Sequence, residues 1–180
     1  MEALRELTGF FPEAAKDIKL NLQSVLAESS LSEGQRWLVA LSCALAKGDH
    51  ALARGIVSAA GPAASEALVD DAKAVAALMA MNNVYYRFRH MVGKESYASL
   101  PARLRMNRLG QPKTAKADFE LASLAVSALN GCELCIQSHE RAVLAQGLSE
   151  AQVHDAARIA ATIAGASAAL GLANFALAAS

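Results

Sequence analysis

The sequence predicts an all-α protein, and three observations carry this prediction. Capping boxes, in which a serine precedes a glutamine by three residues, stand at Ser32 and Ser149, each before an apolar stretch. From Ser65 onward, apolar side chains recur at the three- and four-residue spacing of one helix face. Alanine, the best helix former, is abundant, and no segment shows the sustained alternation of a strand.

The first half of the chain predicts three consecutive helices. The helix opened at Ser32 is expected to end at Gly48, and Asp49 is expected to cap the next helix, which runs to Gly61–Pro62. A third helix begins at Ser65 and continues through Met79 and beyond.

The second half predicts a connector and three more helices. Residues 94–113 contain Pro101, Gly110 and Pro112 and are expected to form the connector. Helices are then expected from about Lys116 to Asn130–Gly131, from about Cys132 to Gly147, and from Ser149 onward.

An internal repeat accompanies this order. Residues 65–80 and 149–164 are identical at nine of sixteen positions. We therefore expect one domain, 1–180, of two related helical units, about 1–93 and about 114–180. The first unit carries Lys47–His50 where the second carries cysteines, so chemistry is expected in the second unit alone.

Composition narrows the function classes. The 180 residues have a net charge of zero, which excludes the basic surface of a nucleic-acid-binding protein. Residues 159–180 are uncharged, but they consist mainly of small side chains, so a buried or intersubunit helix is expected rather than a membrane span. The start of the chain lacks a signal-peptide pattern, which predicts a cytoplasmic protein.

The strongest chemical motif is Cys132-Glu-Leu-Cys135, followed four residues later by His139. Residues three and four apart are neighbours on a helix, so the thiols can close a disulfide with an imidazole one turn further on. Three cysteines are too few, and odd in number, for a structural disulfide framework. The motif therefore indicates redox chemistry or metal binding.

Helix geometry adds a carboxylate to this motif. Glu120 lies eleven residues before Gly131 and His139 lies eight after it, so an antiparallel helix pair would bring them to similar heights. Glu120 could then face His139, with Cys135 one turn nearer the bend. A helix N-terminus favours the thiolate, and a His–carboxylate pair can take or return its proton.

Other interpretations stay open at this point. The two cysteines and His139 could be a zinc site that lacks its fourth ligand, or the thiols could simply pack. Glu133 is expected to point to solvent. Ordinary roles are expected for the remaining candidates, namely core packing for Cys43, Trp37 and Met79, and surface or capping roles for His50, His90 and His154.

Together these residues resemble the alkyl hydroperoxidase D family of the carboxymuconolactone-decarboxylase-like superfamily. The resemblance covers nearly the whole chain and includes residues 15–22, 81–87 and 104–107. The active-site pattern of the family is a glutamate, eleven residues, then C-x-x-C-x-x-x-H, and it falls here on Glu120, Cys132, Cys135 and His139. Some members have a histidine before the second cysteine, where this chain has Leu134.

The resemblance implies a homotrimer that has weak peroxidase activity toward organic hydroperoxides and chiefly reduces a partner peroxiredoxin, AhpC. It implies that dihydrolipoamide on the lipoyl domain of a 2-oxoacid dehydrogenase complex supplies the electrons, with NADH as their indirect source. No bound cofactor is implied.

In this scheme we expect Cys132, which is nearer the helix start, to be the more exposed exchange thiol, and Cys135 to be tuned by His139 and Glu120. A cofactorless decarboxylase, like the other branch of the superfamily, and a non-catalytic thiol or zinc-binding module are the alternatives.

Overall fold

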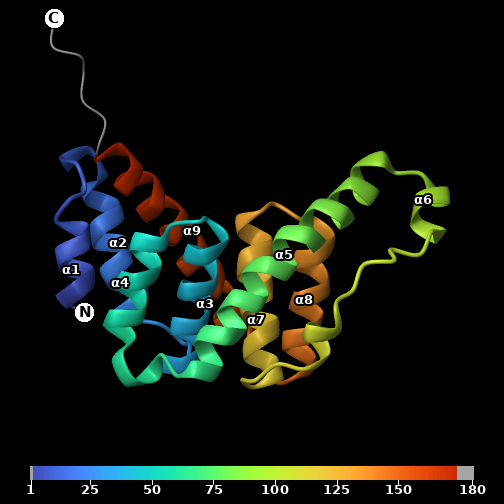
Figure 1. The fold of residues 1–180 in the computed structure, drawn as a ribbon, viewed down its shortest axis with the longest axis horizontal. Coiled ribbons are helices and arrows are strands. Elements are labelled where there is room, and N and C mark those ends of the chain that lie inside the picture. The colour runs from blue at the N-terminus through green and yellow to red at the C-terminus, as the bar shows by residue number, and fades with distance from the viewer. Residues whose placement is uncertain (1, 174–180) are drawn as a thin grey trace, which may run out of the picture.

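The computed structural model describes residues 2–173, and within this range every regular element is a helix, as predicted (Figure 1). The α-helices are α1 (Glu2–Thr8), α2 (Lys16–Ala27), α3 (Glu33–Ala46), α4 (His50–Ala60), α5 (Glu66–Val92), α6 (Glu95–Ser99), α7 (Lys116–Leu129), α8 (Glu133–Ala145) and α9 (Glu150–Leu172). Three short 3-10 helices complete the list, namely η1 (Glu13–Ala15), η2 (Gly61–Ala63) and η3 (Asn107–Gly110).

Helices α3 and α7 form the centre of the molecule. Their side chains are buried nearly all round, because α5 and α9 pack against both of them. The core includes Leu38 of α3, Phe119 of α7 and Ile163 of α9. Trp37 and Met79 also lie in this core, as predicted. A helix that is apolar on every side needs such cover.

The predicted helix starts are confirmed. Ser32 and Ser149 form complete capping boxes, and the side chains of Asp49 and Ser65 cap α4 and α5. Each cap accepts a hydrogen bond from a first-turn N–H group that would otherwise lack a partner. Local sequence therefore fixes where these helices begin.

Two buried or half-buried aspartates at matching positions of the repeat tie the two halves together. Asp71 on α5 accepts hydrogen bonds from the N–H groups of Lys113 and Thr114, just before α7. Asp155 on α9 accepts hydrogen bonds from the N–H and hydroxyl groups of Ser30, just before α3. Each unit thus fixes the segment that leads into a central helix of the other unit: α5 fixes the segment before α7, and α9 fixes the segment before α3.

These bonds also govern the ionisation of both carboxyl groups. Burial alone would raise the pKa of Asp71, but its bonds to Thr114 and Lys113 outweigh burial and lower it. Burial likewise opposes the charge of Asp155, yet the bonds from Ser30 and Arg158 bring its pKa to about 2. Both groups are therefore ionised at neutral pH.

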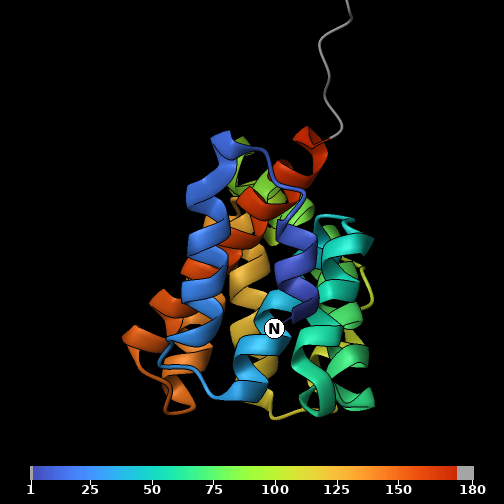
Figure 2. The same cartoon turned by 90° about the vertical axis from the view of Figure 1, so that its left-hand side faces the viewer.

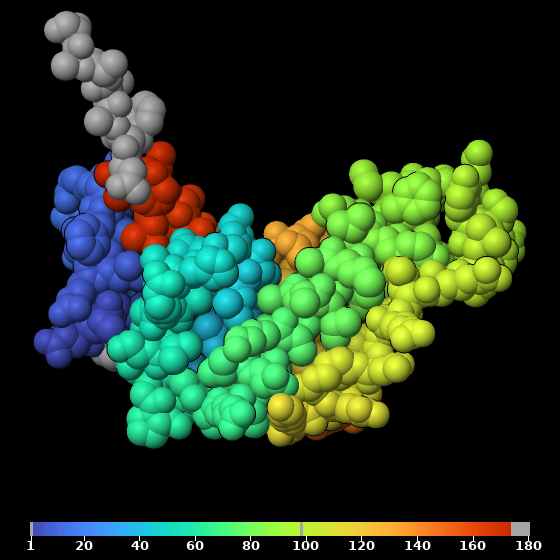
Figure 3. All heavy atoms as spheres, viewed as in Figure 1, coloured from blue at the N-terminus to red at the C-terminus, as the bar shows by residue number. Residues whose placement is uncertain are grey.

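The first 30 residues contain two helices that the sequence did not delineate. Helix α1 packs on α4, and α2 lies along α9 (Figure 2). The connector is largely irregular, as predicted, but it includes α6 and η3. Helix α5 runs well past the body, and with α6 it forms an arm that projects from the molecule (Figures 1 and 3).

The final helix is buried along one face only. Ala156, Ile159 and Ile163 point into the core, whereas Ala161 and Leu172 are exposed. Residues 174–180 of the uncharged stretch lie outside the described residues. Among the helices of residues 2–173, none is both long enough and apolar enough to cross a membrane.

Candidate active site

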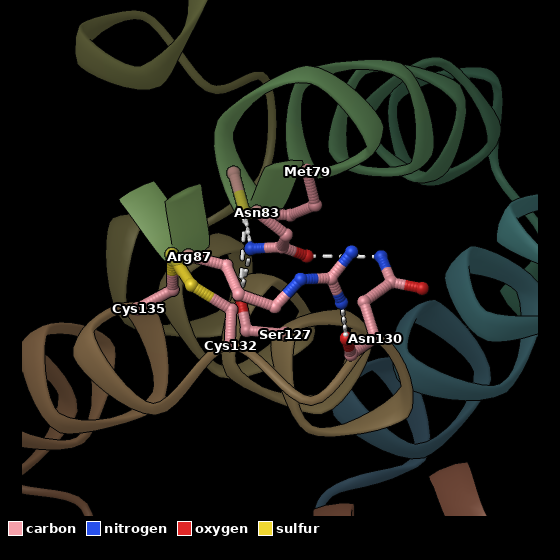
Figure 4. The surroundings of a disulfide bond; sticks show 7 residues. All are labelled: Met79, Asn83, Arg87, Ser127, Asn130, Cys132 and Cys135. Atoms are coloured by element: carbon pink, nitrogen blue, oxygen red, sulfur yellow. Dashed lines mark hydrogen bonds between the residues drawn. A yellow bond between two sulfur atoms is a disulfide. The ribbon is translucent and has the colours of Figure 1, made fainter. Parts of the chain in front are cut away.

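Cys132 and Cys135 form a disulfide at the turn between α7 and α8, with their Cα atoms 5.3 Å apart (Figure 4). Cys132 is the residue that precedes α8, and Cys135 lies in its first turn. The two thiols therefore sit at the N-terminal end of a helix, as the motif predicted.

A tight reversal of the chain creates this position. The N–H of Gly131 donates to the carbonyl of Ala128, and the N–H of Cys132 donates to that of Ser127, both at 3.1 Å. This pair of bonds is a Schellman motif, which needs a left-handed residue after the helix end. Gly131 has φ +65°, where a side chain would cost roughly 1–2 kcal/mol.

The reversal also brings Glu120 and His139 together. Glu120 Oε2 lies 2.7 Å from His139 Nδ1, and both side chains are 14% exposed. The predicted proximity of Glu120 and His139 across the two helices is confirmed. Lys116 Nζ lies 3.7 Å from the other oxygen of Glu120.

His139 and Lys116 stabilise the ionised form of Glu120. Burial raises the pKa of Glu120, but the hydrogen bond and charge of His139, with a smaller contribution from Lys116, lower it below its usual value. A carboxylate in this state can accept a hydrogen bond from Nδ1–H of the imidazole and so orient the ring.

The expected order of exposure of the two cysteines is wrong. Cys132 is fully buried, whereas Cys135 is 6% exposed and lines a pocket of about 400 Å³. The reason is tertiary packing: the helix start is covered, because α5 packs against both α7 and α8. Cys135 is therefore the sulfur that is accessible from the pocket.

One pocket connects the disulfide with the imidazole of His139. Its interior polar groups are Cys135, His139 and the amide of Asn82. Its apolar wall consists of Tyr86, Met106, Leu109 and Leu134, and the exposed side chains Ser138 and Arg141 complete its lining. The connector contributes Met106 and Leu109, so its tether to Asp71 through Lys113 and Thr114 also shapes the site.

A cluster of polar side chains lies beside the disulfide (Figure 4). The sequence analysis did not predict it. Asn83 Nδ2 donates to Ser127 Oγ at 3.0 Å, and Asn130 Nδ2 donates to Asn83 Oδ1 at 2.9 Å. The Arg87 guanidinium donates to the Asn130 carbonyl. The α5 face with Asn83 and Arg87 therefore fixes the turn before Cys132. The one sequence feature that could have indicated this cluster is the pair of polar residues Asn82–Asn83 within a predicted helix.

The remaining candidates have ordinary surroundings. The side chain of Glu133 is exposed, as predicted, and its Oε2 lies 3.2 Å from Nε2 of His90. Cys43 is buried, as predicted, and burial raises the pKa of its thiol to about 12. Within residues 2–173, no three His, Cys, Asp or Glu side chains gather closely enough to hold a metal ion.

Comparison with known proteins identifies the class. A family model described as the carboxymuconolactone decarboxylase family matches residues 95–178. The match covers slightly less than half of the chain and shows that residues 95–178 are similar to this family, in line with the resemblance.

Full-length relatives narrow the class further. The chain is 56% identical over 176 residues to alkyl hydroperoxide reductase AhpD of Anaeromyxobacter sp. (strain K), covering 98% of this chain and 93% of that protein. It is 56% identical over 178 residues to AhpD of Anaeromyxobacter dehalogenans (strain 2CP-C), covering 99% and 96%. For AhpD of Azorhizobium caulinodans the identity is 48% over 159 residues, covering 88% of each chain. The chain belongs to the AhpD family of alkyl hydroperoxide reductases.

The exposure of the three thiols predicts the order of their alkylation. In native protein whose disulfide has been reduced, iodoacetamide should modify Cys135 first, Cys132 more slowly, and Cys43 only after unfolding. Peptide mass spectrometry over a time course measures this order. Faster modification of Cys132 than of Cys135 would contradict the assignment of Cys135 as the accessible sulfur.

The lowered pKa of Glu120 predicts a pH-dependent contribution to stability. Because the folded pKa is below the unfolded one, ionised Glu120 stabilises the protein at neutral pH, and this contribution disappears as the pH falls below about 4.3 and through the folded pKa. Glu120→Gln should therefore lower the free energy of unfolding by about 1–2 kcal/mol at pH 7.

Urea titrations of the wild type and Glu120→Gln from neutral to acidic pH measure this contribution, and the two proteins should converge in acid. Glu28→Gln, at an exposed side chain, is the control. A difference that stays constant across this range would show that Glu120 makes no such contribution.

Proposed function

We propose that this protein is a dithiol/disulfide antioxidant enzyme that reduces a partner peroxiredoxin of the AhpC type and, more slowly, organic hydroperoxides. The observation that carries the proposal is the Cys132–Cys135 pair at the start of α8, with Cys135 and His139 in one pocket and Glu120 bonded to His139. The names of the AhpD relatives support hydroperoxide reduction.

The proposed reduction of the disulfide begins at Cys135. An incoming thiolate attacks the pocket-facing sulfur of Cys135 and displaces Cys132 as a thiolate, which the N-terminus of α8 stabilises. The second thiol of the reductant then displaces Cys135 and closes its own disulfide. The protein gains two electrons and two protons, and the reductant loses them.

The reduced pair can pass these electrons on in two ways. It reduces the disulfide of the peroxiredoxin by the reverse exchange. Alternatively, the Cys135 thiolate attacks a hydroperoxide, which gives a sulfenic acid and an alcohol, and Cys132 then re-forms the disulfide with loss of water. We assign His139 and Glu120 to proton transfer, because Leu134 cannot supply a second imidazole.

The burial of the disulfide favours a slender reductant. Because Cys132 is fully buried and Cys135 is only 6% exposed, a partner's thiol or disulfide reaches them only on a segment that extends into the pocket. A dithiol on a long flexible arm can enter the pocket. We therefore propose dihydrolipoamide on a lipoyl domain as the donor, with NADH as the indirect source, no resident cofactor, and the cytoplasm as the compartment.

Assembly as a homotrimer is also proposed. Large apolar side chains are exposed on α5 and on the arm, including Val84 (60%) beside α3 and α7, and Met91 (77%) and Leu100 (56%) on the arm, where Phe88 packs edge-on against Tyr97. Such a group of exposed apolar side chains typically marks an interface. The family resemblance supplies the number of copies.

The dithiol proposal predicts a reconstituted activity. A lipoyl domain, lipoamide dehydrogenase, NADH and cumene hydroperoxide, with and without peroxiredoxin, should oxidise NADH in a reaction that needs this protein. Cys132→Ser and Cys135→Ser should abolish the reaction, Cys43→Ala should retain it, and thioredoxin should be a poorer donor. NADH absorbance is the readout, and full activity of a serine variant would refute the dithiol scheme.

The assembly proposal predicts a mass. Light scattering should give three times the chain mass of 18.8 kDa for the wild type and a smaller species for Met91→Glu. Leu20→Glu, at an apolar side chain of α2 that is 53% exposed, should leave the mass unchanged. A monomeric wild type, or a trimeric Met91→Glu, would contradict the assignment of the arm as the interface.

A further inference from the structure

The neighbouring asparagines of α5, Asn82 and Asn83, have opposite hydrogen-bonding situations. Both are buried, at 4% and 1% exposure. The amide of Asn83 is bonded at both ends, to Ser127 and to Asn130. The Oδ1 atom of Asn82 is sealed from solvent and has no hydrogen-bond partner among the described residues.

A buried amide oxygen without a hydrogen-bond partner is costly to the fold. Burying such a group without a hydrogen bond costs about 1–3 kcal/mol, whereas an apolar side chain of the same shape would be neutral or stabilising. The packing of residues 2–173 therefore gives no reason for an amide at position 82. Buried polar groups retained at a cost to stability commonly belong to functional sites.

The position of Asn82 indicates which function it has. Asn82 lines the same pocket as Cys135 and His139, and Tyr86, one turn further along α5, lines it too. A half-turn of the terminal side-chain torsion exchanges the amide oxygen and the NH₂ group, so either one can face the pocket. The partner of this amide is thus to be sought in the molecule that enters the pocket.

We propose that Asn82 binds the peroxidic O–H of an alkyl hydroperoxide and orients it for attack by Cys135, an inference that rests on the proposed peroxide reduction. The hydroxyl end of a hydroperoxide is a much stronger hydrogen-bond donor than the S–H group of a dithiol. The wall of Tyr86, Met106 and Leu109 suits its alkyl group.

The reacting atoms then have defined partners. Asn82 accepts the hydrogen bond from the terminal oxygen, which the Cys135 thiolate attacks as the O–O bond breaks. The terminal oxygen becomes the sulfenic acid with its hydrogen, and the alkoxide takes a proton from the His139–Glu120 pair and leaves as the alcohol. Cys132 then expels water and restores the disulfide. A neutral amide suits this role because a carboxylate would repel the thiolate.

The test compares Asn82→Leu with Asn83→Leu, the same substitution at adjacent buried sites. The rate of oxidation of the reduced protein by cumene hydroperoxide is followed by loss of free thiols. The rate of reduction of the disulfide by dihydrolipoamide and the melting temperature are measured on the same samples. For Asn82→Leu we expect about a tenfold slower oxidation, the loss of one hydrogen bond.

If Asn82 binds the hydroperoxide, Asn82→Leu should melt no lower than the wild type and should slow peroxide oxidation far more than disulfide reduction. A purely structural role would instead lower the melting temperature or slow both reactions equally. Asn83→Leu should melt lower because its bonds are lost. Unchanged peroxide oxidation in Asn82→Leu, equal slowing of both reactions, or melting as low as Asn83→Leu would overturn the inference. A wild type inert to the hydroperoxide would overturn the proposed peroxide reduction as well.

Discussion

The site depends on one constraint, the reversal of the chain at Asn130–Gly131. The left-handed conformation of Gly131 allows α7 to end and α8 to begin within three residues. Because the two helices then run antiparallel, Glu120 and His139 meet across them at 2.7 Å. The same reversal places Cys132 before the first turn of α8. A different turn would shift the height of every site residue on α8 relative to α7.

The two units of the chain use this turn for different purposes. In the first unit, Gly48 makes the same reversal, and the Asp49 side chain caps α4 by accepting from the Leu52 N–H. At the matching position the second unit has Cys132, whose side chain makes no capping bond. Giving up such a cap costs about 1 kcal/mol. In exchange, a sulfur lies where uncapped N–H groups favour a thiolate, which suits Cys132 as the displaced group.

Local sequence signals were sufficient to predict the features that depend on short-range geometry alone. The caps at Ser32, Asp49, Ser65 and Ser149 and the Glu120–His139 pair follow from side-chain chemistry and helix rise. Helix α2 was not delineated because Ala15, at its cap position, offers no side-chain bond. The relative exposure of the two cysteines depends on α5, far away in the sequence, so their position along α8 could not predict it.

Helix α5 contributes to three parts of the molecule: the turn before Cys132, the pocket and the arm. One face, with Asn83 and Arg87, holds the turn before Cys132, and another, with Asn82 and Tyr86, lines the pocket. Its far end is the arm (Figure 3), and apolar side chains are exposed there. Since an α-helix transmits displacement along its axis, a partner bound at the arm would also fix the wall of the pocket. The proposed assembly at the arm and the access to Cys135 thus share one continuous helix.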